Sequence, residues 1–267
     1  MATAIVKNKT AGTNVTTLAS AKPAFLQKYR EDAGKGYSHD ADDSLVPFID
    51  VLASDNCPQL KKNNEKFIKG AMVGDIILKG AIHPILPGAG GIVVQPCAFE
   101  KCWVEWVPRI KGGGFVTRHK DRPADAVEKP NPEDETRTKW IRKNGNEVIE
   151  TRYHYVLHKG QPYVIAFKST GHQTSREWTN LMKLLSDGGT LPSYAREYRL
   201  TPKLRTKMDQ EWYVFSVDVL RDKDGEPTFI TDEKQYLAGQ AFEKAIRSGT
   251  KQAAAEDDER ETEATDI

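Results

Sequence analysis

The sequence predicts a mainly β, α+β fold in which an antiparallel barrel carries peripheral helices. Short runs of β-branched and aromatic residues, bounded by glycine and proline, recur through the middle of the chain. Helical spacing of apolar residues stands out in two segments, one between predicted strands and one after the last of them. Because strands and helices do not alternate regularly, a parallel α/β sheet is disfavoured and a closed or partly closed antiparallel barrel is favoured.

The composition divides the chain into three parts. Residues 1–22 are rich in Thr, Ala, Lys and Asn without a sustained period, which predicts a flexible N-terminal arm. Residues 23–249 contain the periodic segments and are predicted to form the folded domain. Residues 250–267 become Ala-rich and then acidic, which predicts a disordered C-terminal tail. Within the domain, three prolines and many charges near 118–138 predict an inserted mobile loop.

Six strands are predicted, each a short apolar or alternating run that ends at a turn signal. They cover Val73–Lys79, Ile92–Val107, Glu147–His158, Tyr163–Lys168, Tyr194–Leu200 and Trp212–Leu220. The connection His158–Pro162 has the length and the glycine of a hairpin. A longer loop around Pro202–Gln210 would join the last two strands.

Two helices are predicted. Ser175–Ser186 carries apolar residues at helical spacing and precedes the stop signal Gly188-Gly189. The second helix would begin at Thr231 as its N-cap and end at Gly249. One helix between strand pairs and one at the end, around about six strands, fits an OB-like antiparallel barrel.

The net charge of +1 is an average over unlike parts of the chain. Residues 256–267 contain seven acidic residues and one arginine, so they carry −6 and the remaining body carries +7. Three cysteines in 267 residues do not make a disulfide framework. No apolar run approaches the roughly 18 residues of a membrane span. We therefore expect a soluble protein of a reducing cytoplasm that does not contact membranes.

The cysteine and histidine spacings do not predict a metal site. Cys97 and Cys102 are five residues apart on a predicted strand, so their side chains should point to opposite faces. His154 and His158 lie roughly 13 Å apart by the rise per residue of a strand, too far for one ion. We interpret them as part of an exposed polar strand face, and we predict no metal and no cofactor.

Glycine runs and loop carboxylates give weak signals for chemistry. Gly112–Gly114 and Gly88–Gly91 lack the Walker pattern, so we interpret them as flexible backbone and a tight turn. Asp222-Lys-Asp-Gly225 has the composition of an ordinary turn. A Mg²⁺-dependent nuclease stays open as an alternative through two groups of acids. These are Asp222 with Asp224, and Asp40 with Asp42 and Asp43.

Aromatic and basic residues interleave on several predicted strands. Single-stranded nucleic acid needs a positive track for its phosphates and flat rings on which unpaired bases stack. The candidate binding residues are Lys101, Trp103, Trp106, Arg109, Arg152, Tyr153, Tyr155, Lys168, Tyr194, Arg196, Tyr198, Arg199, Lys203 and Arg205. The region Tyr194–Lys207 is the most basic, with five cations and one acid. For any single ring, a place in the core is favoured over stacking. For a face shared by Tyr194, Arg196 and Tyr198, the two interpretations are balanced.

The acidic tail predicts regulation and partner binding. A flexible anion tethered to a cationic surface competes with phosphates at high effective concentration, and it becomes free for other proteins when nucleic acid displaces it. The final Asp266-Ile267 would let a partner grip an apolar side chain and the terminal carboxylate. The candidate partner-binding residues are Asp257, Asp258, Glu259, Asp266 and Ile267.

The basic β-rich body with an acidic tail resembles the single-stranded DNA-binding proteins of replication, particularly those of bacteriophages. Three stretches carry the resemblance further: Val104–Arg109, Phe167–Thr170 and Ser175–Met182. The resemblance covers the layout of residues 45–250 and implies an OB fold, cooperative coating of single-stranded DNA and contact of the tail with replication or recombination proteins. The tail lacks the terminal Pro-Phe of the bacterial type, so contact with the host's own machinery is not implied.

The sequence therefore predicts a non-enzymatic protein that coats and protects single-stranded DNA in phage-type replication or recombination, within the cytoplasm of a bacterial host. A metal-dependent nuclease and a structural or assembly protein stay open as alternatives. Homo-oligomerisation is open as well.

Overall fold

The computed structural model describes residues 45–81, 84–131, 134–207 and 210–255. The predicted N-terminal arm and the partner-binding residues Asp257, Asp258, Glu259, Asp266 and Ile267 lie outside these residues. The described strands are β1 Leu45–Val46, β2 Ile49–Val51, β3 Ile76–Leu78, β4 Ile85–Leu86, β5 Ile92–Trp106, β6 Phe115–His119, β7 Val127–Asn131, β8 Asp134–Ile141, β9 Glu147–His158, β10 Gln161–Lys168, β11 Tyr198–Lys207, β12 Gln210–Val219 and β13 Gln252–Ala253. The helices are α2 His172–Leu184 and α3 Glu233–Arg247.

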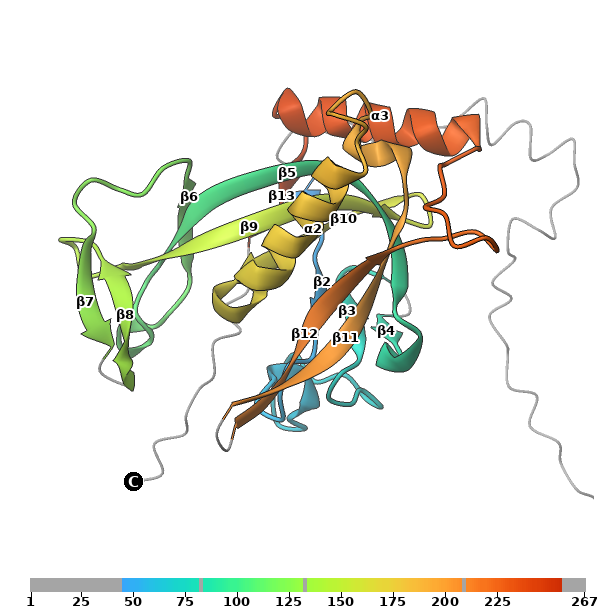
Figure 1. Ribbon diagram of the computed structural model, residues 1–267. Helices are drawn as coiled ribbons and strands as arrows, with labels where there is room; N and C mark the ends of the chain where they lie inside the picture. Colours follow the sequence, from blue (N-terminus) through green and yellow to red (C-terminus); the bar gives the residue numbers. More distant parts are fainter. Residues whose placement is uncertain (1–44, 82–83, 132–133, 208–209, 256–267) are drawn as a thin grey trace, which may run out of the picture. The chain divides into compact units, whose positions relative to one another are not determined.

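The main sheet has eight strands and is built on the long strand β5 (Figure 1). Its order is β12-β11-β5-β9-β8-β7, and β10 pairs with β9 while β6 pairs with β5. Residues Ile92–Val94 of β5 pair with β11, and Gln95–Trp106 pair with β9. A bulge between Pro96 and Ala98 separates the two halves. One strand thus contributes to both halves of the sheet, because a bulge bends the strand that carries it.

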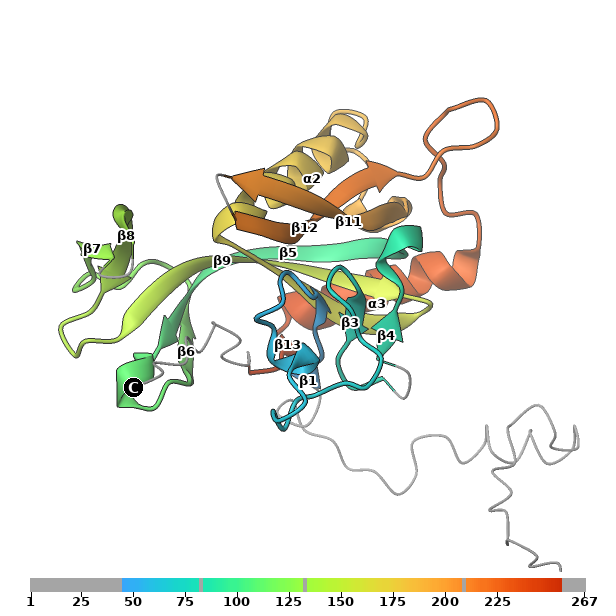
Figure 2. The ribbon, with the colours of Figure 1, turned by 90° about the horizontal axis from the view of Figure 1, so that it is seen from below.

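The segment from β1 to Ala53 runs between β10 and β12. Phe48 forms a parallel bridge with Val164 of β10, and the amide of Tyr213 in β12 donates to the Ala53 carbonyl (2.8 Å). β2 also begins a small sheet of order β2-β3-β4, and β1 pairs in parallel with β13. Figure 2 shows β1 and β13 on the side of the main sheet that α3 also covers.

The prediction of a mainly β, α+β fold with peripheral helices is confirmed. Within the described ranges, the strand pairings form open paths, so the sheets are not closed barrels. The barrel part of the prediction is therefore not confirmed.

Two hydrophobic clusters lie on opposite sides of the main sheet. The first is centred on Trp178 of α2, which packs with Phe167 and Tyr198. The second contains Phe242 of α3, whose ring lies 6.4 Å from that of Tyr155. Each helix therefore buries one face of the sheet, which is why strand residues of both alternating sets are buried.

Both predicted helices exist, with shifted ends. α2 begins at His172, three residues before the predicted start, directly after the 3-10 turn Ser169–Gly171. The N-cap of α3 is Asp232, whose carboxylate accepts the amide of Lys234, and not the predicted Thr231. At Gly239 a Cβ would lie 2.3 Å from Nε2 of Gln95, so α3 approaches β5 closely at a residue without a side chain.

Three predicted segments need correction. The loop near 118–138 is wrong, because β7 and β8 form a hairpin there that pairs with β9. The strand predicted from Tyr194 begins at Tyr198 and continues to Lys207, so the loop around Pro202–Gln210 is mostly strand. The predicted disordered tail begins too early, since β13 is paired and Ala253 is 1% exposed.

The cysteines are free thiols in the described chain. Cys97 and Cys102 are both buried in the same cluster, so the prediction that they point to opposite faces is wrong. The bulge at Pro96/Ala98 shifts the alternation between them. Burial raises the pKa of the Cys97 thiol to about 12, which makes it a poor nucleophile. In the described ranges, neither helix has the length and apolar character needed to cross a bilayer.

Candidate nucleic-acid interface

Four of the predicted stacking rings belong to the core. Trp106 is 1% exposed, Tyr153 0%, Tyr155 3% and Tyr198 1%. Burial raises the pKa of the Tyr198 hydroxyl to about 12, and it raises that of Tyr155 further. A ring without exposed area has no face to offer a base, so the prediction that these four residues stack is wrong.

The predicted face of Tyr194, Arg196 and Tyr198 does not exist. Tyr194 lies in a 3-10 turn, Ser193–Ala195, before β11 begins, so strand alternation does not bring the three side chains together. The guanidinium of Arg196 donates to the carbonyls of Pro227 (2.6 Å) and Thr228 (3.1 Å) and stacks 3.6 Å over the Phe229 ring. Arg196 thus holds the loop after β12 in place, and its guanidinium is already hydrogen-bonded to that loop. Arg199 is exposed and donates to the Gly90 carbonyl (3.2 Å).

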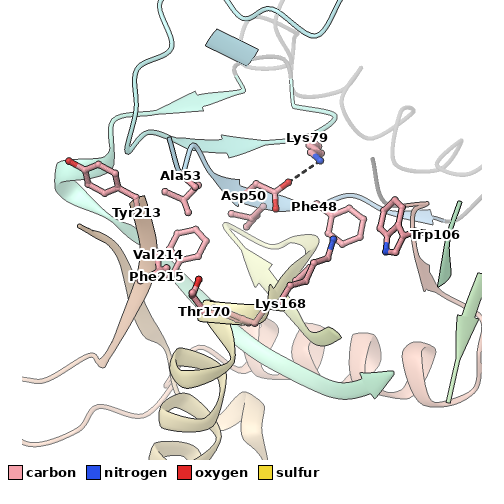
Figure 3. Close-up of a pocket in the computed structure, with 15 residues that line it drawn as sticks. Phe48, Asp50, Ala53, Lys79, Trp106, Lys168, Thr170, Tyr213, Val214 and Phe215 are labelled. Carbon is pink, nitrogen blue, oxygen red and sulfur yellow. Dashed lines mark ion pairs between the residues drawn. The ribbon is translucent and has the colours of Figure 1, made fainter. Parts of the chain in front are cut away.

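A cavity of about 310 Å³ lies between the end of β10 and the start of β12 (Figure 3). Lys168 reaches into it from β10, with its ammonium nitrogen 5.0 Å from the centroid of the Trp106 ring. Lys79 lies 5.6 Å from the centroid of Phe48 and pairs with Asp50 (2.9 Å). The cavity therefore combines two cations with aromatic walls. Phe48 is buried, so it supports the wall.

A second cavity of about 390 Å³ shares Thr170 with the first. It is lined by the 3-10 turn after β10, the first turns of α2 and the β11–β12 hairpin. Arg176 approaches from α2, while Arg205 and Trp212 are cross-strand partners on the hairpin. Arg176 is exposed, and Arg205 and Trp212 are half-buried. Because the two cavities share Thr170 in their lining, we refer to them together as the β10–β12 groove.

The charge of the groove is positive at neutral pH. Its lining cations are Lys79, Lys168, Arg176 and Arg205, and Asp50 is the carboxylate among the lining residues. His172 also lines the second cavity, and its Nε2 donates to the carbonyl of Glu150 (2.9 Å). Burial lowers the pKa of His172, and the nearby arginines lower it further. His172 is therefore neutral at pH 7 and adds a polar contact but no charge.

A second, partly exposed aromatic group lies on the extension formed by β6, β7 and β8, the segments that join them, and the end of β5 that carries Trp103. We call this extension the arm. The rings of Trp103 and Trp140 meet edge to face at 6.1 Å, and both are half-buried. The guanidinium of Arg122 lies 3.8 Å from the centroid of Trp140 and 5.8 Å from that of Trp103. Figure 1 shows the β7–β8 hairpin beyond the end of β5 and β9.

The arm is fixed at its root by a buried carboxylate. Glu105 is 1% exposed and accepts hydrogen bonds from His119 (2.7 Å), Arg142 (2.7 Å), Asn144 (3.1 Å) and Asn146 (2.6 Å). Burial alone would raise the pKa of Glu105, but these bonds outweigh it and lower the pKa to about 2. The ionised carboxylate therefore holds β6 and the β8–β9 turn against β5.

Glu150 forms ion pairs with two basic residues of the main sheet. Its carboxylate pairs with Lys101 (3.2 Å) and Arg152 (3.1 Å), which are predicted binding residues. Burial opposes ionisation of Glu150, but the hydrogen bonds from the two cations lower its pKa. Lys101 and Arg152 are thus anchored beside Trp103, which is the strand partner of Glu150.

The remaining predicted residues have mixed positions. Lys203 is exposed on β11, two residues from Arg205 and on the same face by strand alternation. Arg109 begins a 3-10 turn, and its side chain lies outside the described part of the structure. His154 and His158 are buried, at 0% and 6% exposure, so the predicted exposed polar face is wrong there.

His154 is held between rings. It stacks on Trp178 at 4.5 Å and 3°, and its Nε2 lies 2.8 Å from the Ser175 hydroxyl. Burial, with a smaller effect of Arg152, lowers the pKa of His154 to about 3. The neutral ring therefore joins α2 to β9 as part of the core.

The structure assigns no metal-binding cluster of His, Cys, Asp or Glu within the described ranges. Asp222 accepts the amides of Asp224 (2.9 Å) and Glu226 (3.0 Å). The prediction of an ordinary turn at this position is confirmed. Asp40, Asp42 and Asp43 lie outside the described residues.

Comparison with known proteins gives a family. A sequence model of the family described as Pam3 phage gp34-like protein matches residues 12–252, which is most of the chain. The chain belongs to this family. The membership supports the bacteriophage part of the resemblance found in the sequence. No curated protein and no solved structure matches the chain.

In this gp34-like protein, five residues of the candidate interface were not predicted from the sequence. They are Lys79, Arg122, Trp140, Arg176 and Trp212. Arg122 was assigned to the loop near 118–138, and Trp140 was assigned to no element. Asn144-Gly145 is a hairpin signal that would have placed Trp140 on a strand. Arg176 and Trp212 come together through contacts between helix and hairpin, which local pattern does not contain.

Proposed function

We propose that this protein binds single-stranded DNA, without catalysis, in the β10–β12 groove. The observation that carries the proposal is the groove itself, where Lys168, Arg176 and Arg205 meet the half-buried rings of Trp212 and Tyr213. Phosphates need mobile or exposed cations, and unpaired bases need accessible rings. The groove offers both, with exposed Arg176 and half-buried Arg205 beside the Trp212 ring.

We also propose that β5, β9, β10, β11 and β12 form an OB-type barrel with an inserted strand. Three features support this. β5 pairs with both β9 and β11, α2 connects β10 to β11, and β11 and β12 form a hairpin. The segment containing Phe48 and Ala53 bridges β10 to β12, where such a barrel would otherwise be partly open.

The proposed site lies away from the usual OB binding face because other elements cover that face. OB folds bind oligonucleotides on the face of the second and third strands and on the adjoining loops. Here the corresponding face of β9 carries Tyr153 and Tyr155, which are buried beneath α3, β1 and β13. A nucleic acid would therefore reach the end of β10 and the β11–β12 hairpin, which these elements leave open.

The acidic tail completes the proposed function in phage-type replication or recombination. The described chain holds the root of the tail: the amide of Ala254 donates to the Val46 carbonyl (2.9 Å), and Arg118 donates to the Ala254 carbonyl. Val46 is two residues from Phe48 in the wall of the groove. A segment with seven acids attached there competes with DNA phosphates and, once displaced, recruits partner proteins.

A binding titration tests the groove. Fluorescent oligo-dT is titrated with wild-type protein and with the double variant Lys168→Glu, Arg205→Glu, between about 50 mM and about 200 mM salt. We expect wild-type affinity to fall with salt, and the double variant to bind more weakly with a shallower salt dependence. The matched control is Lys223→Glu, Lys234→Glu, which makes the same charge change on exposed residues outside the groove. Equal loss in both double variants, or no binding by wild-type protein at low salt, contradicts the proposal.

Truncation after Ala255 tests the tail. We expect the truncated protein to bind oligo-dT more tightly at low salt, because the tethered anion no longer competes. Unchanged affinity removes the competition but leaves partner recruitment in place.

A further inference from the structure

We propose that Trp103, Trp140 and Arg122 on the arm form a second contact for single-stranded nucleic acid, reached only by strands long enough to extend beyond the β10–β12 groove. The inference rests on the proposed function and assigns a separate part of the path. It adds a place where one base stacks on the accessible part of the two indoles while Arg122 neutralises a neighbouring phosphate.

The geometry of the cluster suits an unpaired base. Arg122 lies 3.8 Å from the centroid of Trp140, the spacing of a stacked cation and ring, and it is itself exposed. A guanidinium plane also stacks on bases, so the group presents one more flat surface beside the two indoles. Arg122 makes no carboxylate pair among the described residues, which leaves its charge for a phosphate.

A line of basic and polar groups connects the cluster to the groove. Arg176 in the groove acts electrostatically on His172, as does Arg152. His172 donates to the backbone of Glu150, whose side chain holds Lys101 and Arg152. Trp103 is the strand partner of Glu150, so the line ends at the cluster.

The root of the arm makes the position of the cluster definite. Glu105, two residues from Trp103 on the same face of β5, ties the β8–β9 turn through Arg142 and Asn146. Trp140 lies on β8 just before this turn. The two indoles are therefore held at a fixed separation, and a bound base would not have to order the arm.

The test compares short and long strands. Wild-type protein, Arg122→Gln and Trp140→Ala are titrated with oligo-dT of about 4 to about 30 nucleotides, which spans the roughly 4–16 nucleotides bound by OB-type sites. We expect short strands to bind all three proteins equally. Long strands should bind the variants roughly 5-fold to 100-fold more weakly than wild type, the range of one lost stacking contact. Lys223→Gln serves as the charge control and should leave every length unchanged.

Fluorescence gives a second readout. In a Trp212→Phe background, the remaining indoles are the buried Trp106 and Trp178 and the arm residues Trp103 and Trp140. Long strands should quench this fluorescence and short strands should not. If Trp140→Ala fails to fold, Arg122→Gln decides the outcome, because its side chain is exposed.

The outcomes separate the two proposals. Equal binding of all lengths by the variants and by wild type overturns the arm contact and leaves the groove standing. Equal weakening at every length also overturns it, because the cluster would then not be a separate contact. Failure of wild-type protein to bind any length overturns the proposed function itself.

Discussion

The segment Tyr194–Arg199 and the arm cluster of Trp103, Trp140 and Arg122 both combine aromatic rings with arginine, but their surroundings differ. In the first, the Tyr198 ring is 1% exposed and Arg196 is bound to two carbonyls. In the second, both indoles are half-buried and the arginine is exposed. Aromatic and basic residues are therefore available to a ligand only where no helix or loop covers them.

Whether a side chain on the sheet is buried depends on helices and loops that are distant in sequence. α2 buries Tyr198 through Trp178, and the loop after β12 takes up Arg196 through Phe229. The arm extends past the first turn of α2 (Figure 1), and its Trp103 and Trp140 are half-buried while Arg122 is exposed. Substitutions in Tyr194–Arg199 should therefore mainly change stability, whereas substitutions in the arm cluster should mainly change binding of oligo-dT.

The largest expected difference is between Tyr198→Ala and Trp103→Ala. Removing the fully buried Tyr198 ring leaves a cavity and should lower the free energy of unfolding by about 3–5 kcal/mol. The folded fraction should still bind oligo-dT with wild-type affinity. Trp103→Ala should cost less stability and weaken binding of long oligo-dT. Denaturant unfolding combined with titration measures both quantities, and a binding loss in folded Tyr198→Ala would break the comparison.

Glu105→Gln should loosen the arm without affecting the other region. The substitution removes the charge that His119 and Arg142 bind, at a cost of about 2–3 kcal/mol. In wild-type protein, the lowered pKa of Glu105 stabilises the fold above pH about 4.5, and this contribution is lost as pH falls towards 2. Acid unfolding should show this loss in wild type and not in the variant.

Asp125→Asn is the matched control for Glu105→Gln. Asp125 pairs with the same Arg142 at 3.0 Å but is half-buried at the surface, so its loss should cost much less. Equal destabilisation by the two substitutions would show that burial of Glu105 is not what fixes the arm.

His154 of β9 stacks on Trp178 in the core, and it should make the free energy of unfolding depend on pH. Because its pKa is about 3 in the folded protein, the unfolded state binds the proton more readily below pH 6.5. Stability should therefore fall as pH drops from 6.5 towards 3, by at most about 1.4 kcal/mol per pH unit from this group. His154→Phe should flatten the curve measured by denaturant unfolding, and an unchanged slope would contradict the assignment.

The smallest expected effect distinguishes two arginines of one predicted cationic region. Arg205→Gln should reduce the slope of log affinity against log salt by about 0.7, the value for one phosphate contact on a single strand. Arg196→Gln should leave the slope unchanged, since its charge is bound to Pro227 and Thr228. A larger slope change for Arg196→Gln would reverse the comparison.

The sequence predicts the bounds of the long strands better than it predicts which side chains are exposed. The strand Glu147–His158 was found at its observed bounds, and β5 within one residue, because both are long and rich in strand-forming residues. The hairpin β7–β8 was missed because charges and prolines hide its pairing with β9. Its Pro130 lies on the edge strand β7, where a missing amide is tolerated.

The candidate site was predictable in type and partly in place. Lys168 and Arg205 line the groove, and Trp103 lies on the arm, as residues chosen for interleaved charge and aromaticity. Trp106 and Tyr153 were chosen by the same criterion and are core. Alternation along a strand assigns side chains to two faces of the sheet but does not show which face a distant helix covers. Here α2 covers one face and α3 covers the other.

Photo-crosslinking with peptide mapping tests the central claim most directly. A long oligo-dT carrying a photoreactive base is bound at low salt, irradiated, and located on the protein by mass spectrometry. The account predicts crosslinked peptides that contain Trp103, Trp140 and Trp212, with a short strand marking Trp212 alone. Crosslinks confined to Tyr194–Arg199, or spread evenly over the surface, would contradict it.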